Sequence, residues 1–138
     1  MKALRTILAL AALAANTATY GGDKAPPVAL KGNDPVSYFN SPRPVKGASS
    51  YAYDFDDTRY LFASAKNKEL FSADPDRYAP QFTGLCTTGL SMGMKAQADP
   101  EVYLVKDGKL YVFSSPEARD MAFKDPSVIE RARQNFEK

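Results

Sequence analysis

The chain has 138 residues, which is enough for one domain with a sizeable core. Hydrophobic residues make up 44% and charged residues 25% of the chain, as is typical of globular proteins. The formal net charge is +2, and setting aside Lys2 and Arg5, the only charges before Asp23, leaves 16 basic and 16 acidic residues. No basic block remains to neutralise phosphates, so nucleic-acid binding is not expected.

The N-terminal residues follow the order of a secretory signal peptide. A positively charged start precedes an apolar run over residues 7–15, and small residues follow. That run is too short to span a bilayer, although a retained anchor or a buried helix is the alternative interpretation. We therefore predict a signal peptide over residues 1–18, a periplasmic or secreted mature protein, and no stable membrane span after cleavage.

The residues after the predicted signal peptide are rich in glycine and proline. Residues 19–30 predict an extended lead-in, after which residues 31–138 are expected to form a single domain. Near the start of that domain, Asp34 before Pro35 predicts one helical turn that ends at Asn40.

A hairpin followed by a helix is predicted twice. Aromatic residues alternate over residues 51–62 around an Asp-Asp turn, and Ser64 then caps a short helix that ends before a proline. Residues 101–115 similarly read as a strand, an Asp-Gly turn and a strand. Ser115 caps the helix that follows, and a last helix runs from about Pro126 towards the C-terminus.

A shift of 51 positions superimposes these two ββα segments without a gap, so that Tyr60 meets Tyr111. We interpret the match as an internal pseudo-repeat, although any hairpin followed by a helix needs similar turn and cap residues. The expected fold class is α+β, with two ββα-like units forming a small antiparallel sheet on which helices pack. Residues 76–98 join the units, and we expect them to have no counterpart in the repeat and to carry function.

That joining segment contains the only cysteine of the chain, and the chain has no histidine. Thiolate and thioether groups are soft ligands that favour Cu(I). The sequence therefore predicts a site for copper or another soft ion at Cys86, Met92 and Met94. The predicted binding segment consists of the cysteine and the glycines that let the backbone turn around it: Gly84, Cys86, Gly89 and Gly93.

Two other roles for Cys86 stay open. Cysteine and methionine commonly fill gaps in a core, so the sulfur groups can be simple packing residues. A nucleophilic thiol needs a base or a positive environment, and Lys95 is the nearest cation in sequence. Without a histidine or a C-x-x-C pair, an enzyme is not the favoured interpretation.

Several ordered stretches resemble the secreted bacterial YHS domain-containing proteins: "ALKGNDPVSYF", "PVKG", "YLFASAKNKELFSADPDRYAPQFTGLC" and "DGKLY". The resemblance runs from about Ala29 to the C-terminus and implies a small α+β metal-binding-type module. In members with an F-C-S-x-x-C pair, cysteines stand where this chain has Ala63 and Asn67, so that metal site is not implied here. The secreted subgroup tends to carry a Gly-Gly-Tyr-Cys-Ala segment, of which Gly84 and Cys86 are kept.

The sequence therefore favours an exported, non-enzymatic binding module that holds copper or another soft ion through Cys86 and the nearby methionines. The alternative is a periplasmic accessory domain that binds a protein partner and buries Cys86 as a structural residue. A thiol-dependent enzyme is a third reading.

Overall fold

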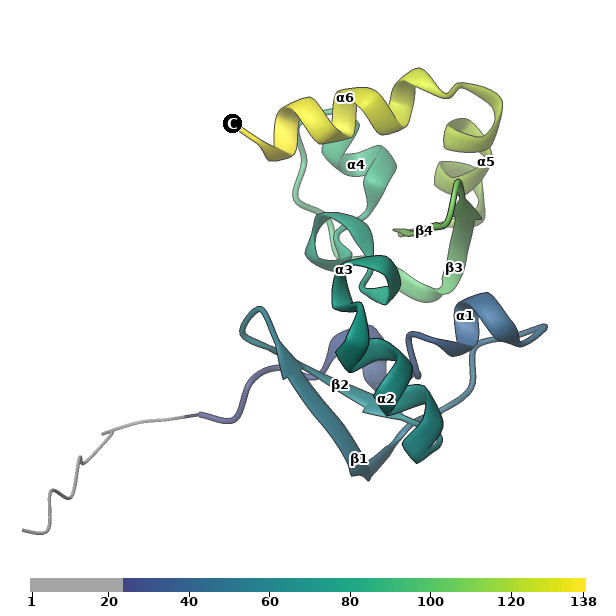
Figure 1. Cartoon of the computed structure of the whole chain (residues 1–138). Helices are drawn as coiled ribbons and strands as arrows, with labels where there is room; N and C mark the ends of the chain where they lie inside the picture. The colour runs from purple at the N-terminus through teal and green to yellow at the C-terminus, as the bar shows by residue number, and fades with distance from the viewer. Residues whose placement is uncertain (1–23) are drawn as a thin grey trace, which may run out of the picture.

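The computed structural model describes residues 24–138. The predicted signal peptide and the start of the lead-in lie outside the described residues. Figure 1 shows two lobes, with the first hairpin and its helix below and the second hairpin with the C-terminal helices above. Within these lobes we call residues 28–73 the first unit and residues 80–124 the second unit.

The first unit is a 3-10 turn, a short helix, a hairpin and a longer helix. Its hairpin turns at two aspartates with left-handed backbone, Asp56 and Asp57, and Ser64 Oγ accepts a hydrogen bond from Asn67 N at 3.1 Å to start the helix. Its elements, with the short helix that follows it, are η1 (Ala29–Gly32), α1 (Ser37–Asn40), β1 (Ala48–Phe55), β2 (Thr58–Phe62), α2 (Ala65–Ala73) and α3 (Pro75–Tyr78). The predicted hairpin, cap and helical turn ending at Asn40 are confirmed.

The second unit repeats this plan. Its hairpin turns at Asp107 and Gly108, and Ser115 Oγ accepts from Ala118 N at 3.2 Å. Its elements, with the last helix, are η2 (Gln81–Gly84), α4 (Thr87–Ser91), β3 (Asp99–Lys106), β4 (Lys109–Phe113), α5 (Pro116–Lys124) and α6 (Ser127–Phe136). The predicted α+β class and the two ββα units are therefore confirmed.

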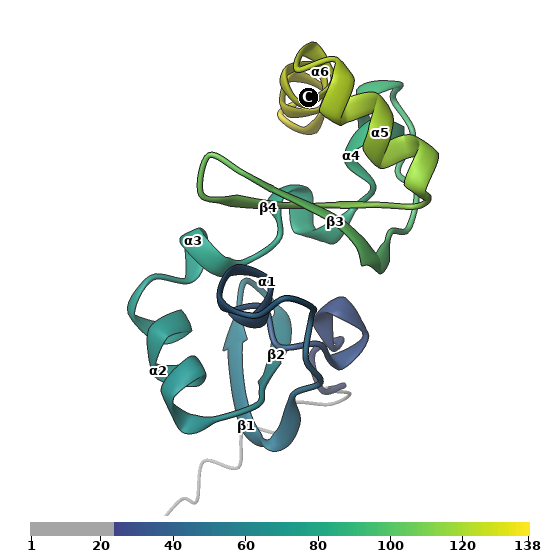
Figure 2. The same ribbon diagram turned by 90° about the vertical axis from the view of Figure 1, so that its right-hand side faces the viewer.

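The strands differ from the expectation in one respect, because they form two separate two-stranded sheets. The outer edge of β2 is occupied by the lead-in, where Arg59 N donates to Pro27 O at 2.9 Å beside the bridge between Val28 and Arg59. The edge of β4 is likewise occupied by a bridge from Pro80 to Leu110. An edge that already has a partner cannot pair with the other hairpin, and Figure 2 shows the two hairpins running in different directions.

The expectation that residues 76–98 have no counterpart is wrong. Both units open with a 3-10 turn that contains two consecutive left-handed residues, Leu30 and Lys31 in η1 and Phe82 and Thr83 in η2. The pairing that follows is also shared, since the bridge between Asn33 and Lys46 corresponds to the bridge between Leu85 and Gln97. The offset is 52 residues before the short helix and 51 after it, so a shift without a gap does not detect the match.

Each unit has its own core, and a third cluster joins them. Phe71 lies at the centre of the first core and Phe113 in the second. Between them, Tyr38 packs with the β4 residues Leu110 and Val112. Tyr38 Oη also donates to Pro100 O at 2.7 Å, so that hydrophobic contact and a buried hydrogen bond together hold the two units against each other.

Candidate functional site

Cys86 is the N-cap of α4 and is 1% exposed. Its Sγ accepts hydrogen bonds from Ser114 N at 3.2 Å and from Gly89 N at 3.4 Å, and it donates to Ser114 Oγ at 3.3 Å. The thiol is free of any disulfide, but its hydrogen-bonding positions are filled by the protein itself. This is the geometry of a structural residue that fastens α4 to the end of β4.

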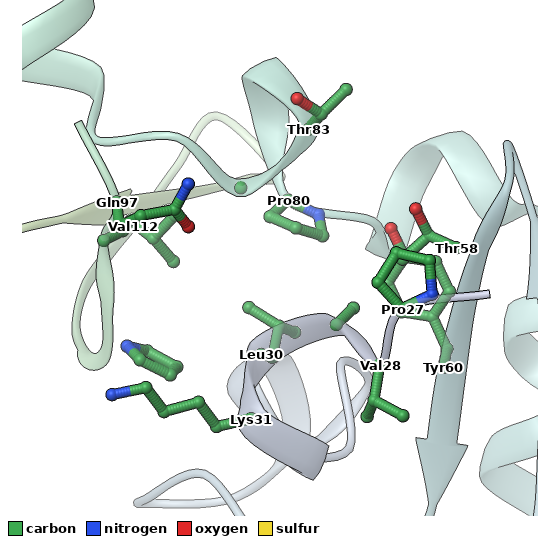
Figure 3. Close-up of a pocket in the computed structure, with 14 residues that line it drawn as sticks. Pro27, Val28, Leu30, Lys31, Thr58, Tyr60, Pro80, Thr83, Gln97 and Val112 are labelled. Atoms are coloured by element: carbon green, nitrogen blue, oxygen red, sulfur yellow. The ribbon is translucent and has the colours of Figure 1, made fainter. Parts of the chain in front are cut away.

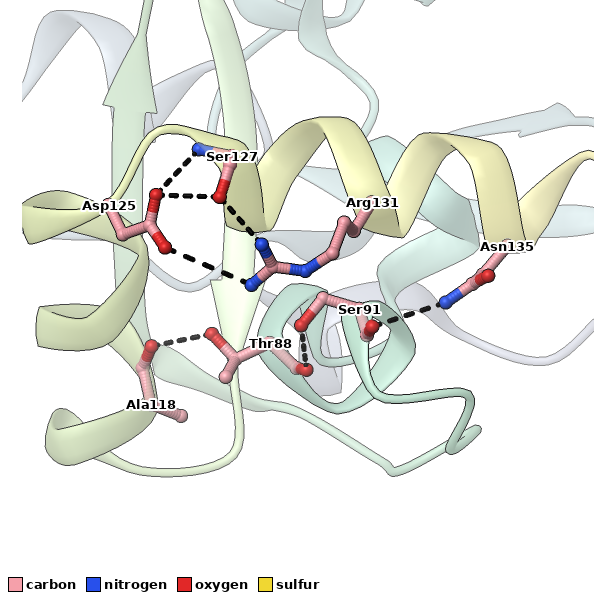
Figure 4. A network of polar contacts seen from close by, with 7 residues as sticks. All are labelled: Thr88, Ser91, Ala118, Asp125, Ser127, Arg131 and Asn135. Carbon is pink, nitrogen blue, oxygen red and sulfur yellow. Dashed lines mark hydrogen bonds and ion pairs between the residues drawn. The ribbon is translucent and has the colours of Figure 1, made fainter.

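The helix that Cys86 caps is itself fastened between α5 and α6 (Figure 4). Thr88 Oγ1 donates to Ala118 O at 2.6 Å, and Asn135 Nδ2 donates to Leu90 O at 2.9 Å and to Ser91 O at 3.2 Å. The side chains of Thr88 and Asn135 thus hold α4 against α5 and α6, and Cys86 adds the connection to the hairpin.

The two predicted methionine ligands lie in a different environment. Met92 and Met94 follow α4 and are 57% and 53% exposed, whereas the thiol of Cys86 is buried. Gly93 between them has a left-handed backbone, and Gly89 lies inside α4, where a Cβ would come within 3.3 Å of Ala96 Cβ. The structure therefore places the predicted ligands on one short segment, with Cys86 buried and both methionines exposed to solvent. The soft-metal site stays a prediction.

Ala63 and Asn67, where the resemblance to YHS domains implies a cysteine pair, lie beside a buried carboxyl group. Asp34 is fully buried, and its Oδ2 accepts hydrogen bonds from Ala63 N at 2.9 Å and from Asn67 Nδ2 at 2.8 Å. Its Oδ1 accepts from Val36 N at 2.8 Å. Within residues 24–138, no three histidine, cysteine, aspartate or glutamate side chains gather in a way that could hold a metal ion.

Asp34 and Cys86 occupy equivalent places in the two units. Each follows the left-handed turn of its unit, and each accepts a hydrogen bond from the backbone N–H directly after the returning strand, Ala63 N for Asp34 and Ser114 N for Cys86. Sequence reasoning assigned Asp34 to a helix cap and missed this role. An alignment of the units that allows a one-residue gap would have paired the two side chains.

A cavity of about 450 Å³ lies between the units, and we call it the inter-unit cavity (Figure 3). Its apolar lining includes Leu30 and Pro80 on facing walls and Val112 of β4, and its charged and polar lining residues are Lys31, Thr58, Tyr60, Thr83 and Gln97. Ligand sites are commonly concave, mainly apolar and of this size, with a few polar groups that fix orientation. The sequence did not predict the cavity because its walls come from five separate segments.

The polar groups of the cavity differ in their electrostatics. Burial, helped by the nearby Asp56, raises the pKa of Tyr60 to about 12, so its hydroxyl stays neutral near pH 7. Lys46 Nζ donates to Lys31 O at 2.8 Å, so a second ammonium group lies beside η1, outside the cavity lining. A smaller hollow of about 200 Å³ shares Thr58, Tyr60, Pro80 and Thr83 with the cavity and is lined by Asp56 and Asp76.

The fold and this cavity define a small α+β module built from two similar halves. Residues 36–82 match the sequence model of the YHS domain, from the residue before α1 into η2. The chain therefore contains a match to the YHS domain over these residues, and this domain family is associated with metal binding. Neither the curated proteins nor the solved structures gave a match to the chain. In residues 24–138 no helix combines the length and apolar character needed to cross a membrane.

Proposed function

We propose that this protein is an exported, non-enzymatic binding module that holds its ligand in the inter-unit cavity, with Cys86 as a structural residue. The observation that carries the proposal is the cavity itself, which is walled by both units and sized for a small ligand. The contacts of Tyr38 with the second unit support the proposal, since they are buried and hold the two walls of the cavity together without a ligand.

The environment of Cys86 favours binding over thiol chemistry. A nucleophilic sulfur must reach its substrate, and this sulfur is 1% exposed and hydrogen-bonded to Ser114 and Gly89. Native thiol labelling tests this part of the proposal. We expect Cys86 to react only after unfolding, and rapid labelling of the folded protein near neutral pH would contradict the structural role.

The cavity is tested by filling it. Val28 is 49% exposed and lines the cavity, so Val28→Trp should block the space without disturbing a core. Val45 is 43% exposed and lies outside the cavity lining, so Val45→Trp is the matched control. We expect a fragment library observed by ligand-detected NMR to yield binders that Val28→Trp loses and Val45→Trp keeps. Binders that are equally insensitive to both substitutions would overturn the proposal.

Export is tested in cells. If residues 1–18 are a signal peptide, the full chain should appear outside the cytoplasm with a new N-terminus near residue 19. A chain that begins at residue 19 should stay in the cytoplasm. Fractionation followed by N-terminal sequencing distinguishes the two results, and a full-length chain that remains uncleaved in the cytoplasm would contradict export.

A soft-metal site is the second candidate function. It is favoured by the YHS domain and by the two exposed methionines on either side of Gly93, which lie six and eight residues after Cys86. In this case Cu(I) binding should fall in Cys86→Ser and in the double variant Met92→Leu/Met94→Leu. A competitive Cu(I) titration measures both, and equal weak binding by the natural protein and Cys86→Ser would remove this candidate.

A further inference from the structure

The charge lining the inter-unit cavity is positive. Lys31 is the only charged residue among those that line it, and it takes part in no ion pair within residues 24–138. The ammonium group of Lys46, which is outside the lining, lies 2.8 Å from Lys31 O. Uncompensated positive charge beside a low-dielectric wall attracts an anion, so the electrostatics of the cavity favour a negatively charged ligand.

The rest of the lining fits an apolar body. Leu30, Pro80 and Val112 face the space, with hydroxyl and amide groups between them (Figure 3). Tyr60 is a neutral phenol near pH 7, and burial raises its pKa further, to about 12, so it can donate or accept a hydrogen bond. These groups can orient a ligand but cannot neutralise a cation.

The two ends of the cavity differ in charge. In Figure 3, Lys31 and Thr58 lie on opposite sides of it. Thr58 belongs to the wall shared with the smaller hollow, which contains Asp56 and Asp76. Carboxylates beyond this far wall repel a second negative charge, so a ligand with one anionic group at the lysine end fits better than a dianion.

Backbone strain is concentrated in the same walls. Outside the hairpin turns, the non-glycine residues with left-handed backbone within residues 24–138 are Leu30, Lys31, Phe82 and Thr83. Three of these four line the cavity. Such conformations cost about 1–3 kcal/mol each and persist where the surrounding structure imposes them, often at ligand sites.

We infer that the inter-unit cavity binds a small amphipathic monocarboxylate, with its carboxylate beside Lys31 and its apolar body against Leu30, Pro80 and Val112. The inference rests on the proposed function, because it assigns a ligand class to the same cavity. It is separate from the soft-metal candidate, since it uses neither Cys86 nor the methionines.

The test compares three probes with one apolar body. Hexanoate, hexanamide and hexylamine are titrated into the mature protein at low ionic strength, and binding is followed by two-dimensional NMR. We expect the carboxylate to bind most tightly, the amide less tightly and the amine least. Added salt should weaken hexanoate binding, because it screens the attraction between the carboxylate and the exposed ammonium group of Lys31. The Debye length is about 8–10 Å near physiological ionic strength.

Substitution of the lysine makes the test specific. Lys31→Gln should weaken hexanoate binding roughly three- to tenfold and leave hexanamide unchanged, as expected for one partly exposed charge pair. Lys31→Arg should restore most of the affinity. Lys66→Gln on α2 is the matched control, since it removes an exposed lysine outside the cavity lining.

The possible failures are distinguishable. If the amide binds as tightly as the carboxylate, or if Lys31→Gln leaves hexanoate affinity unchanged, the ligand class is wrong. The proposed function still stands in that case, provided that Val28→Trp abolishes binding of the probes. If no probe binds, the monocarboxylate assignment is overturned, and the fragment screen with Val28→Trp then decides whether the cavity binds anything.

Discussion

The two units follow the same backbone path and fasten it with different chemistry. In the first unit the carboxyl group of Asp34 accepts three hydrogen bonds, from Val36 N, Ala63 N and Asn67 Nδ2. In the second unit Cys86 accepts two, from Gly89 N and Ser114 N. The residue equivalent to Asn67 is Ala118, which has no side-chain donor. The number of donors around each site therefore matches the acceptor capacity of the residue that fills it.

The same comparison explains why neither unit completes a cysteine-based metal site. The first unit has Ala63 and Asn67 at the positions where the resemblance implies cysteines, and it has a carboxyl group at the facing position. The second unit has the sulfur of Cys86 at the facing position, but Ser114 and Ala118 stand where the pair would be. Each unit thus uses the site to hold its helices and hairpin together.

The largest difference between the units should be the loss of stability when the side chain of Asp34 or of its equivalent, Cys86, is removed. Asp34→Ala leaves one buried and two partly buried donors without an acceptor, and an unpaired buried donor costs about 1–3 kcal/mol, so we expect a loss of about 3–5 kcal/mol. Urea unfolding of the mature protein measures it. Asp54→Ala, which removes an exposed ion pair with Arg59, is the control and should cost far less. Similar losses of stability for Asp34→Ala and Asp54→Ala would show that the hydrogen bonds of Asp34 do not stabilise the fold.

A second contrast lies at the start of the hairpins. A Cβ at Gly47 would overlap the backbone of Leu61 and lie 2.6 Å from Phe62 N, whereas the 51-residue offset places Ala98 at the equivalent position. We expect Gly47→Ala to cost about 2–3 kcal/mol through overpacking against backbone. The reverse change, Ala98→Gly, should cost about 1 kcal/mol. Thermal unfolding of both variants checks the order, and equal losses would mean that the approach of the strands is the same in both units.

Substitutions at Cys86 should have smaller effects than those at Asp34. Cys86→Ala removes the acceptor for two backbone donors and leaves a small void, for an expected loss of about 1–2 kcal/mol. Cys86→Ser keeps an acceptor at the N-cap of α4 and should lose less. Urea unfolding of the two variants measures this difference. A serine variant less stable than the alanine variant would mean that burial of the apolar sulfur matters more than its hydrogen bonds.

The smallest contrast is expected in alkaline solution. The folded pKa of Tyr60 is about 12 because of burial, so the fold retains a proton that the unfolded chain loses above its ordinary pKa of 10. This contribution to stability is complete below pH 10 and is lost as the pH rises through 12. Burial also raises the pKa of Tyr111, the equivalent residue, but Arg133 opposes that rise.

Tyr60→Phe should therefore flatten the alkaline decline in stability more than Tyr111→Phe does. Urea unfolding at a series of pH values measures the decline, and ultraviolet titration of tyrosinate reports the pKa values directly. If both variants reduced the alkaline decline in stability equally, the inferred difference between the environments of Tyr60 and Tyr111 would be wrong.

Local features of the fold were predictable from the sequence. The hairpin turns, the Ser64 and Ser115 caps and the helix ends before proline depend on a few neighbouring residues, and all of them are confirmed. The separation of the sheets was not predictable in this way. It depends on the lead-in pairing with Arg59, a contact between residues far apart in sequence.

The candidate site was less predictable, because burial and three-dimensional placement decide it. Cys86 and the two methionines are neighbours in sequence, yet the sulfur atoms face a buried hydrogen-bond network in one case and the surface in the other. The role of Asp34 depends on Asn67, which is 33 residues away. Lys31 gave no sequence signal, since only the fold brings it to the wall of a cavity.

The pairing of each hairpin with the segment directly before it has a consequence for synthesis of the chain. All the strand partners of the first unit lie within residues 28–62, so this half can complete its strand pairing before the second half leaves the ribosome. Tyr38, which packs between the two units, stays exposed until β4 has been synthesised and Leu110 packs against it. The order of translation thus matches the order in which the two halves can close.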